Sequence, residues 1–362
     1  MSLGRVLIAL IVLLVAGERP AAAAESLSIA VGGANIVAYL PLTIASELGY
    51  FKAAGIDVTI NDVQSGTKMA EALVGGSADI GFGSYEHVIH LRPKGLDVVC
   101  IMLINHTYGA VIGLTKEHAA TYKSPADLKG YRMGVIAPGS ALDVALQLLI
   151  AKAGLSHDDV VSVGVGAGAG AIAAMKSGRL DGISHADPVI SRLIRDGDIV
   201  PIVDTRTEAG IKYLYNGLFA GSAVLSKESV TKEHAQAVQA FMTQIIRAFR
   251  FMKTAPIDQV MALVPAAYYG PDKDIYQRTL TGNRTTELPT IALDLLLQCF
   301  HPVQDKRKRR RGGRTSRHRP RRHRPPLPTD AVLHYASSCT FPFPSAAIRG
   351  RWSALSDASA LV

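Results

Sequence analysis

Two stretches of the chain that begin 102 residues apart share one short pattern. Residues 72–79 read ALVGGSAD and residues 174–181 read AMKSGRLD. Each has the end of an apolar helix, a glycine that stops the helix, and an aspartate that leads into a short strand. A residue able to cap a new helix follows each strand, Ser84 in the first copy and Asp187 in the second. A supersecondary unit that occurs twice predicts two similar α/β lobes, and two lobes imply a cleft.

The first 24 residues have the pattern of a secretory signal peptide. A basic start ends at Arg5, an apolar run covers 6–16, and Ala22-x-Ala24 suits cleavage before Glu25. The apolar run is too short to span a bilayer, and no later stretch is long enough. We therefore expect an exported, soluble protein.

The net charge of +9 comes from the end of the chain. Residues 299–362 carry a net charge of +11, whereas residues 1–298 are nearly neutral at −2. A segment this rich in Arg, His and Pro cannot bury apolar surface, which favours disorder. Out-of-frame translation of a GC-rich gene would also produce so abrupt a change, and we favour this interpretation. The alternatives are a genuine disordered extension and a polyanion-binding segment, although an export signal argues against a nucleic-acid partner.

Local patterns divide the chain into five segments. These are a signal peptide at 1–24, the first part of lobe 1 at 25–115, lobe 2 at 116–220, a return to lobe 1 at 221–298, and the tail at 299–362. Strands are predicted at 27–31, 58–60, 80–83, 97–104, 110–115, 133–136, 160–163, 182–184 and 199–203. The strand at 110–115 is predicted to carry the crossing into lobe 2. Apolar residues at helical spacing across 232–253 predict a long helix packed on the sheet of lobe 1.

Two glycine-containing loops are candidate ligand contacts. The run 163–171 loosely fits a dinucleotide fingerprint, but an exported protein has little access to such cofactors. We interpret it as a loop whose backbone approaches a ligand or the opposing lobe. Residues 138–143 (PGSALD) open a helix directly after a strand. Its N–H groups could bind an anion, or Ser140 could cap the helix with Asp143 completing a capping box, and the two interpretations are compatible.

A pair of histidines could bind a metal ion. His87 and His90 would share one face of a helix. The sequence offers no evident third ligand, so we favour histidines on a helix surface and expect neither a metal nor a cofactor.

Polar side chains follow the ends of both repeated strands. Tyr85 lies beside Ser84, and His185 and Asp187 occupy the matching place in the second copy. Open α/β sheets bind ligands at such strand ends. The chain shows no Ser/His/Asp order or carboxylate pair with catalytic spacing, so we expect a binding protein and no enzyme.

Several motifs resemble those of a known family. In order, they are residues 40–52 (LPLTIASELGYFK), 55–58 (GIDV), 81–84 (GFGS), 124–130 (SPADLKG), 138–140 (PGS) and 187–188 (DP). They resemble nitrate/sulfonate/taurine-type solute-binding proteins of ABC importers, an NMT1-like family, and the resemblance covers about 27–282. It implies a type II periplasmic binding fold, with two α/β lobes, two crossovers, a hinge and an interlobe ligand cleft. It further implies a periplasmic monomer that meets the membrane only through a permease and its ATPase. The tail departs from the family.

The resemblance also implies a set of ligand contacts. They come from the loop after the first strand, the start of the second helix, and the strand ends and helix starts described above. The residues at these positions are Asn35, Tyr39, Gly66, Thr67, Ser84, Tyr85, Gly139, Ser140, His185 and Asp187.

The sequence does not decide between the ligands of this family. Lys68 is the only basic residue beside an expected contact, but helix N-termini can hold a sulfonate without one. Tyr39 and Tyr85 could instead stack on a planar ring. Our hypothesis is a small anionic or zwitterionic organic solute of the sulfonate, taurine or nitrate class. The alternatives are a thiamine-precursor pyrimidine, or an enzyme on the same fold such as a pyrimidine-synthase-like or menaquinone-pathway protein.

Overall fold

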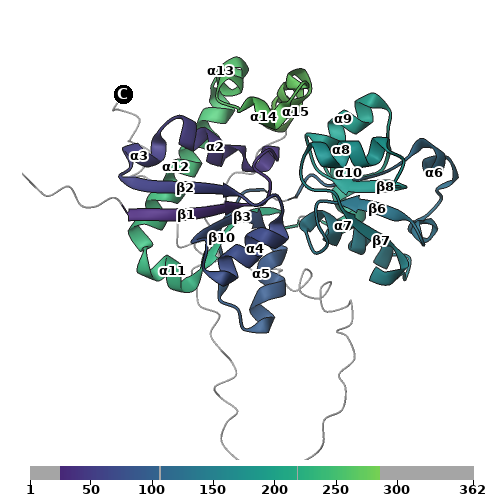
Figure 1. Cartoon of the computed structure of the whole chain (residues 1–362), viewed down its shortest axis with the longest axis horizontal. Coiled ribbons are helices and arrows are strands. Elements are labelled where there is room, and N and C mark those ends of the chain that lie inside the picture. Colours follow the sequence, from purple (N-terminus) through teal and green to yellow (C-terminus); the bar gives the residue numbers. More distant parts are fainter. Residues whose placement is uncertain (1–24, 106, 218, 286–362) are drawn as a thin grey trace, which may run out of the picture. The chain divides into compact units, whose positions relative to one another are not determined.

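The computed structural model describes residues 25–105, 107–217 and 219–285. The predicted signal peptide and the basic tail lie outside these ranges. The described residues form two five-stranded sheets with helices packed on them, which we call lobe 1 and lobe 2 (Figure 1). The strands of lobe 1 are β1 (Glu25–Val31), β2 (Ile56–Asp62), β3 (Ile80–Ser84), β4 (Val98–Leu103) and β10 (Ser222–Lys227). Those of lobe 2 are β5 (Val111–Leu114), β6 (Arg132–Val135), β7 (Val161–Gly164), β8 (Gly182–His185) and β9 (Val200–Asp204).

The two sheets have equivalent topologies. Their strand orders are β2-β1-β3-β10-β4 and β7-β6-β8-β5-β9. In each, the first three strands are parallel, and the fourth runs antiparallel to both of its neighbours. The prediction of two similar α/β lobes is therefore confirmed.

One predicted boundary is wrong. The strand at 110–115 was assigned to lobe 1, but β5 pairs with β8 and β9 in the sheet of lobe 2. The first crossover therefore precedes β5, and the second lies between α10 and β10. A strand's own residues do not record which sheet it joins, because that depends on pairing with segments far away in the chain.

Helices separate and follow the strands of both lobes. Lobe 1 contains η1 (Val37–Tyr39), α2 (Leu40–Glu47), α3 (Tyr50–Ala53), α4 (Gly66–Gly75), α5 (Glu86–Leu91) and η2 (Arg92–Lys94). Lobe 2 contains α6 (Lys116–Thr121), η3 (Pro125–Leu128), α7 (Ala141–Ala151), η4 (His157–Asp159), α8 (Ala169–Lys176), α9 (Val189–Asp196) and α10 (Glu208–Tyr215). After β10 follow α11 (Glu228–Glu233), α12 (Ala235–Thr254), α13 (Ile257–Ala262), α14 (Ala266–Tyr269) and α15 (Lys273–Thr285). The motif at 124–130 contains η3, a short 3₁₀ turn that begins with a Ser124–Asp127 capping box.

The repeated aspartates have the same structural role in both lobes. The carboxylate of Asp79 accepts the backbone N–H of Ser28 in the middle of β1, at 2.8 Å. The carboxylate of Asp181 accepts the N–H of Arg132 at the start of β6, at 2.7 Å. Each aspartate also donates its own N–H to the carbonyl of that same residue, at 2.9 Å. In each copy of the repeat, the aspartate therefore forms hydrogen bonds to the neighbouring parallel strand.

Both faces of the sheet in lobe 1 are buried. Along β1, Ile29 and Val31 belong to the apolar cluster that contains α2 and α12, whereas Ala30 belongs to the cluster with α4 and α5. Successive side chains of a strand point to opposite faces, so a strand covered on both sides is apolar throughout. This burial explains the uninterrupted apolar runs in the sequence.

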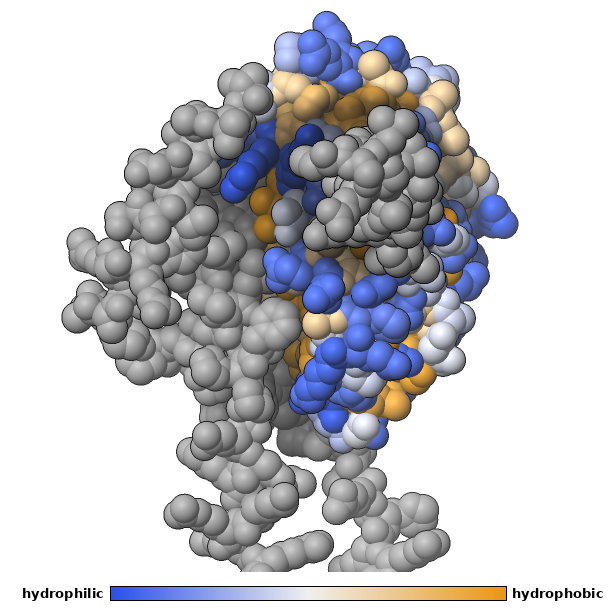
Figure 2. All heavy atoms as spheres, turned by 90° about the vertical axis from the view of Figure 1, so that its left-hand side faces the viewer, coloured by the Kyte–Doolittle hydropathy of each residue, from blue (hydrophilic) through white to orange (hydrophobic). Residues whose placement is uncertain are grey.

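The predicted long helix is α12, and it packs on lobe 1 as expected. Phe241 is fully buried, stacks on Phe51 with 5.2 Å between ring centroids, and meets the edge of Phe82 at 6.1 Å. On the face shown in Figure 2, hydrophilic residues predominate among those drawn in colour. Within residues 25–285, leaving out 106 and 218, no helix has the length and apolar character that a bilayer span requires.

Candidate ligand-binding site

The loops that follow the strand ends of the two lobes meet at two hydrogen bonds. Asn35 follows β1, and its Nδ2 donates to the carbonyl of Ala167 after β7, at 2.9 Å. Thr67 lies in the first turn of α4, and its Oγ1 donates to the carbonyl of Pro138 after β6, at 3.1 Å. Two of the residues that the resemblance implies as contacts therefore lie where the lobes meet.

The glycine-rich loop of lobe 2 approaches lobe 1 closely. Gly33 has a φ of +115°, and a Cβ placed on it would lie 2.7 Å from the Cβ of Ala167. A larger residue at Gly33 would therefore be strained and would also push the loops apart. The interpretation of 163–171 as a loop that approaches the opposing lobe is confirmed.

The start of α4 leaves backbone donors available. Ser65 caps the helix by accepting the N–H of Lys68 at 3.2 Å. Within the described parts of the chain, the N–H groups of Gly66 and Thr67 have no hydrogen-bond acceptor. A Cβ on Gly66 would lie 2.7 Å from Nε2 of His87. The lack of a side chain at Gly66 thus makes room for that imidazole against the helix.

The carboxylate of Asp143, in the first turn of α7, lies at the start of that helix. Ser140 is buried, and its Oγ accepts the N–H of Asp143 at 3.4 Å. The Asp143 carboxylate accepts the N–H of Gly139 at 2.8 Å, and this buried charge lies at the positive end of the helix. Ser140 therefore caps α7 as predicted, but the predicted capping box is not formed, because Asp143 accepts the N–H of Gly139 while the N–H of Ser140 donates to the carbonyl of Ala137. The carboxylate of Asp143 lies where an anionic ligand would otherwise bind.

His185 joins the end of β8 to the glycine-rich loop. Its Nδ1 lies 3.0 Å from the N–H of Ala186, and its Nε2 lies 3.0 Å from the carbonyl of Gly166. A neutral imidazole that carries its proton on Nε2 satisfies both contacts. Burial lowers the pKa of His185, which favours this neutral form.

Asp187 is held within lobe 2. One carboxylate oxygen accepts the backbone N–H and the hydroxyl of Ser191, at 3.0 and 2.6 Å. The other lies 3.1 Å from the guanidinium of Arg206, which also pairs with Asp204. Burial opposes the charge on Arg206, but the two carboxylates outweigh it and raise the pKa of that side chain. Asp187 therefore has partners of its own, which the sequence pattern did not reveal.

The remaining implied contacts lie on lobe 1. Tyr39 is packed in the core, with its ring edge-on to Phe82 at 6.2 Å between centroids. Tyr85 is half-buried, and its backbone N–H donates to the carbonyl of Gly221 at the second crossover. Ser84 is buried, and its hydroxyl donates to the carboxylate of Glu86.

Glu86 is a further candidate site residue, which the sequence pattern did not indicate. Its side chain is buried, with 2% of its surface exposed. Its carboxylate also accepts the hydroxyl of Tyr108, which lies on the first crossover. Burial raises the pKa values of Tyr39, Tyr108 and Tyr215, and the negative charge of Glu86 adds to each rise. We call these four residues, with Ser84 and His87, the Glu86 cluster.

One histidine differs from the prediction of helix-surface histidines. His90 is exposed as predicted, but His87 is 5% exposed and lies between Gly66 and Gly83. The prediction was wrong for His87 because both contacts are glycines, whose missing side chains leave space that a helical pattern does not show. Among the described residues, no group of three or more potential ligands could hold a metal ion.

The chain matches a known protein family. The model of a family described as NMT1/THI5 like matches residues 37–258, which is more than half of the chain. The chain belongs to the NMT1/THI5-like family. A structure from Bordetella bronchiseptica RB50 is 38% identical with a TM-score of 0.68, covering 73% of this chain and 83% of that one.

More distant relatives of this NMT1/THI5-like protein agree on the fold. The alkanesulfonate-binding protein SsuA of Xanthomonas axonopodis pv. citri, solved with MOPS, has a TM-score of 0.59. It is 22% identical, and the match covers 72% of this chain and 85% of that one. This likeness confirms the predicted type II periplasmic binding fold.

Curated relatives match over only part of their length. A candidate binding protein of Brucella abortus (strain 2308) is 28% identical over 221 residues, covering 60% of this chain and 64% of the relative. The chain thus spans less than two thirds of that relative. Binding proteins predominate among the relatives, but pyrimidine phosphate synthases match as well.

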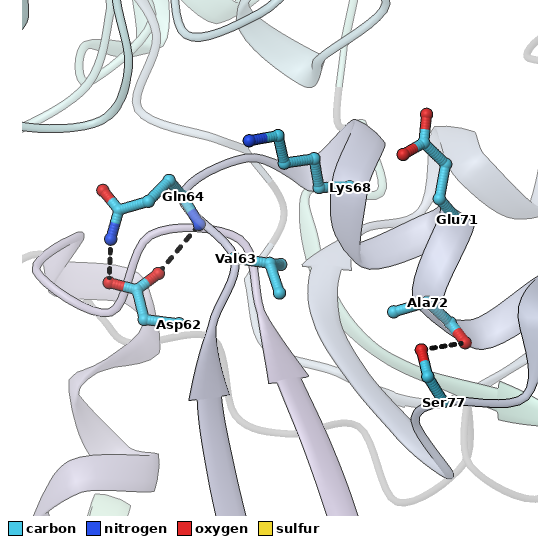
Figure 3. Close-up of a pocket in the computed structure, with 7 residues that line it drawn as sticks. All are labelled: Asp62, Val63, Gln64, Lys68, Glu71, Ala72 and Ser77. Atoms are coloured by element: carbon cyan, nitrogen blue, oxygen red, sulfur yellow. Dashed lines mark hydrogen bonds between the residues drawn. The ribbon is translucent and has the colours of Figure 1, made fainter.

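A surface hollow of this NMT1/THI5-like protein lies beside α4 (Figure 3). It is lined by Asp62, Val63, Gln64, Lys68, Glu71, Ala72 and Ser77. Its polar groups largely bond to one another, since Gln64 donates twice to Asp62 and Ser77 donates to Ala72. The hollow contains none of the implied contacts, although it includes Lys68, and we assign it no role.

We expect acidification below about pH 6.5 to destabilise this NMT1/THI5-like protein through His185. Since the pKa of His185 is lowered on folding, the unfolded chain binds a proton that the folded chain refuses. The pKa of a histidine in the unfolded chain is about 6.5. Above this pH, His185 does not reduce the free energy of unfolding, whereas below it the free energy falls by up to about 1.4 kcal/mol per pH unit. Urea unfolding at pH 7.5 and 5.5 should show a smaller difference for His185→Gln than for the wild type. Exposed His157→Gln is the control, and equal pH dependence in all three proteins would contradict the prediction.

Proposed function

We propose that this protein is the exported solute-binding component of an ABC importer. It captures a small anionic or zwitterionic organic solute between its lobes and delivers it to a permease that works with an ATPase. We propose that it acts as a periplasmic monomer, and that it meets the membrane only through the permease.

The observation that carries this proposal is the meeting of the two lobes at their strand-end loops. Asn35 and Thr67 of lobe 1, two of the implied contacts, donate to carbonyls of lobe 2. Among residues 25–285, the chain passes between the lobes twice, once before β5 and once after β9. Such connections can act as a hinge, so that the lobes part to admit a solute and close on it.

Both the residues at the interface and the relatives support binding rather than catalysis. The most polar implied contacts, Asp187, His185 and Ser140, have structural partners that fix their positions. No pair of them forms a nucleophile and base within hydrogen-bond reach. The names of several relatives state binding, of alkanesulfonates in one case and of formylaminopyrimidine in another.

A thermal-shift screen tests the proposal. The mature protein is mixed with taurine, alkanesulfonates, nitrate or hydroxymethylpyrimidine, and its unfolding is followed. A ligand at about 100 times its Kd should add roughly 2.7 kcal/mol to the free energy of unfolding. Stabilisation by hydroxymethylpyrimidine alone would contradict the proposed solute class and favour a thiamine-precursor pyrimidine as the ligand. A new product after incubation with a stabilising compound would instead support an enzyme.

A variant that crowds the interface provides a matched comparison. Gly33→Val should keep the fold of each lobe but hold the loops around Ala167 apart, because no room exists for a Cβ there. It should bind the stabilising ligand more weakly than the wild type. Equal stabilisation of both proteins would place the ligand elsewhere.

A further inference from the structure

The Glu86 cluster concentrates negative charge where the chain crosses between the lobes. Glu86 follows the end of β3, and its two carboxylate oxygens accept the hydroxyls of Ser84 and Tyr108. A carboxylate offers about four acceptor positions, so two hydroxyl donors do not exhaust it. Neither of these hydroxyl donors, the ones that Glu86 has among the described residues, carries a positive charge. A buried carboxylate without a cationic partner is costly.

Aromatic side chains from both crossovers surround this carboxylate. Tyr108 lies on the first crossover and meets Phe219 of the second at 5.7 Å between ring centroids. Tyr215, at the end of α10 in lobe 2, stacks on the same Phe219 at 4.6 Å. Rings around a carboxylate attract cations, because ring faces carry partial negative charge.

Two buried polar atoms in the cluster lack a hydrogen-bond partner within the described ranges. They are Nε2 of His87, in lobe 1, and the hydroxyl of Tyr215, in lobe 2. His87 is 5% exposed, and its Nε2 lies 3.7 Å from the nearer oxygen of Glu86. Buried polar groups are normally paired, so each such atom calls for an explanation. A polar ligand between the lobes would satisfy both.

The Glu86 cluster also adjoins the start of α4, which carries a partial positive charge. The unpaired N–H groups of Gly66 and Thr67 open α4, a helix of ten residues, and His87 lies directly against Gly66. Helix starts favour negative groups. His87 therefore lies between an anion-favouring helix start and the carboxylate of Glu86. A simple anion would suit the first and be repelled by the second.

We propose that the Glu86 cluster selects solutes that carry a cationic nitrogen a few bonds away from an anionic group. The nitrogen pairs with Glu86 among the tyrosine rings, and the anionic group lies at the start of α4 beside His87. This inference rests on the proposed function and narrows it from anionic or zwitterionic solutes to zwitterionic ones.

Matched pairs of probes test the proposal by calorimetric titration. Taurine is compared with isethionate, and β-alanine with 3-hydroxypropionate, since each pair differs only in an ammonium against a hydroxyl. The wild type should bind at least one ammonium member about tenfold or more tightly than its partner, as expected for a hydrogen bond to a charged group. Glu86→Gln should reduce this preference to about one. Glu117→Gln, at an exposed position of α6, should keep it.

The outcomes separate this inference from the proposed function. Equal binding of isethionate and taurine by the wild type would overturn the selection by Glu86 and leave the solute-binding role intact. Binding of no probe, by a protein that unfolds cooperatively, would overturn both. If Glu86→Gln does not fold, Tyr108→Phe serves instead, because it removes one donor from the carboxylate and keeps the ring. The preference should then stay the same or rise, whereas a fall to one would overturn the proposal.

Discussion

Replacing Phe241 by alanine is expected to lower the free energy of unfolding by about 3–5 kcal/mol. The side chain is fully buried between α12 and the sheet of lobe 1, and its ring contacts Phe51 and Phe82. Removal costs the transfer free energy of the ring, and a cavity remains because a strand and a helix cannot move together freely. Urea unfolding followed by circular dichroism measures the effect.

The control for this prediction lies on the same helix. Gln239 is exposed on α12, so Gln239→Ala should change the free energy of unfolding by less than about 0.5 kcal/mol. If the two variants were equally stable, α12 would not be packed on lobe 1 as the structure has it.

Replacing Asp79 by alanine is expected to cost about 2–3 kcal/mol. Its carboxylate accepts both the backbone N–H and the hydroxyl of Ser28, in the middle of β1, at 2.8 and 2.6 Å. A hydrogen bond to a charged group contributes about 1.5–3 kcal/mol, and partial exposure keeps the sum of two near the upper part of that range. The shift in the urea midpoint of Asp79→Ala measures it.

The second copy of the repeat supplies the matched comparison. Asp181 accepts a single backbone N–H, from Arg132, and its side chain is 30% exposed. Asp181→Ala should therefore cost less than Asp79→Ala, about 1 kcal/mol. A larger loss of stability for Asp181→Ala than for Asp79→Ala would show that these hydrogen bonds do not determine the free energies of unfolding of the two variants.

Local signals explain why the fold could be predicted from the sequence. Gly76 and Gly178 stop their helices at φ values of +77° and +68°, which other residues rarely adopt. Asp79 and Asp181 then lead into strands whose apolar residues are buried on both faces of the sheets. These features depend on residues close together in the chain, so the repeat and most element positions were visible without coordinates.

The partners of the site residues could not be predicted in the same way. Glu86 meets Tyr108, 22 residues further along, and His185 meets the carbonyl of Gly166, 19 residues before it. Asp187 meets Arg206 across a similar separation. A side chain's partners across such distances follow from how the strands are ordered in the sheet. The sequence therefore indicated where polar residues gather at strand ends, but not which of them are already paired.

The position of β10 in its sheet has a consequence for how the protein is made. This strand lies between β3 and β4 and is the one strand in the described part of the chain that pairs with β4, yet it follows the whole of lobe 2. The strands of lobe 2 run from β5 to β9 without interruption, so that sheet can close before the rest of the chain has emerged into the compartment where the protein folds. Until residues 222–227 emerge, β3 has an unpaired edge and β4 has no partner, and such edges invite pairing with other chains. The order of the strands along the chain thus allows the second lobe to be completed first and leaves the first lobe dependent on a single late strand.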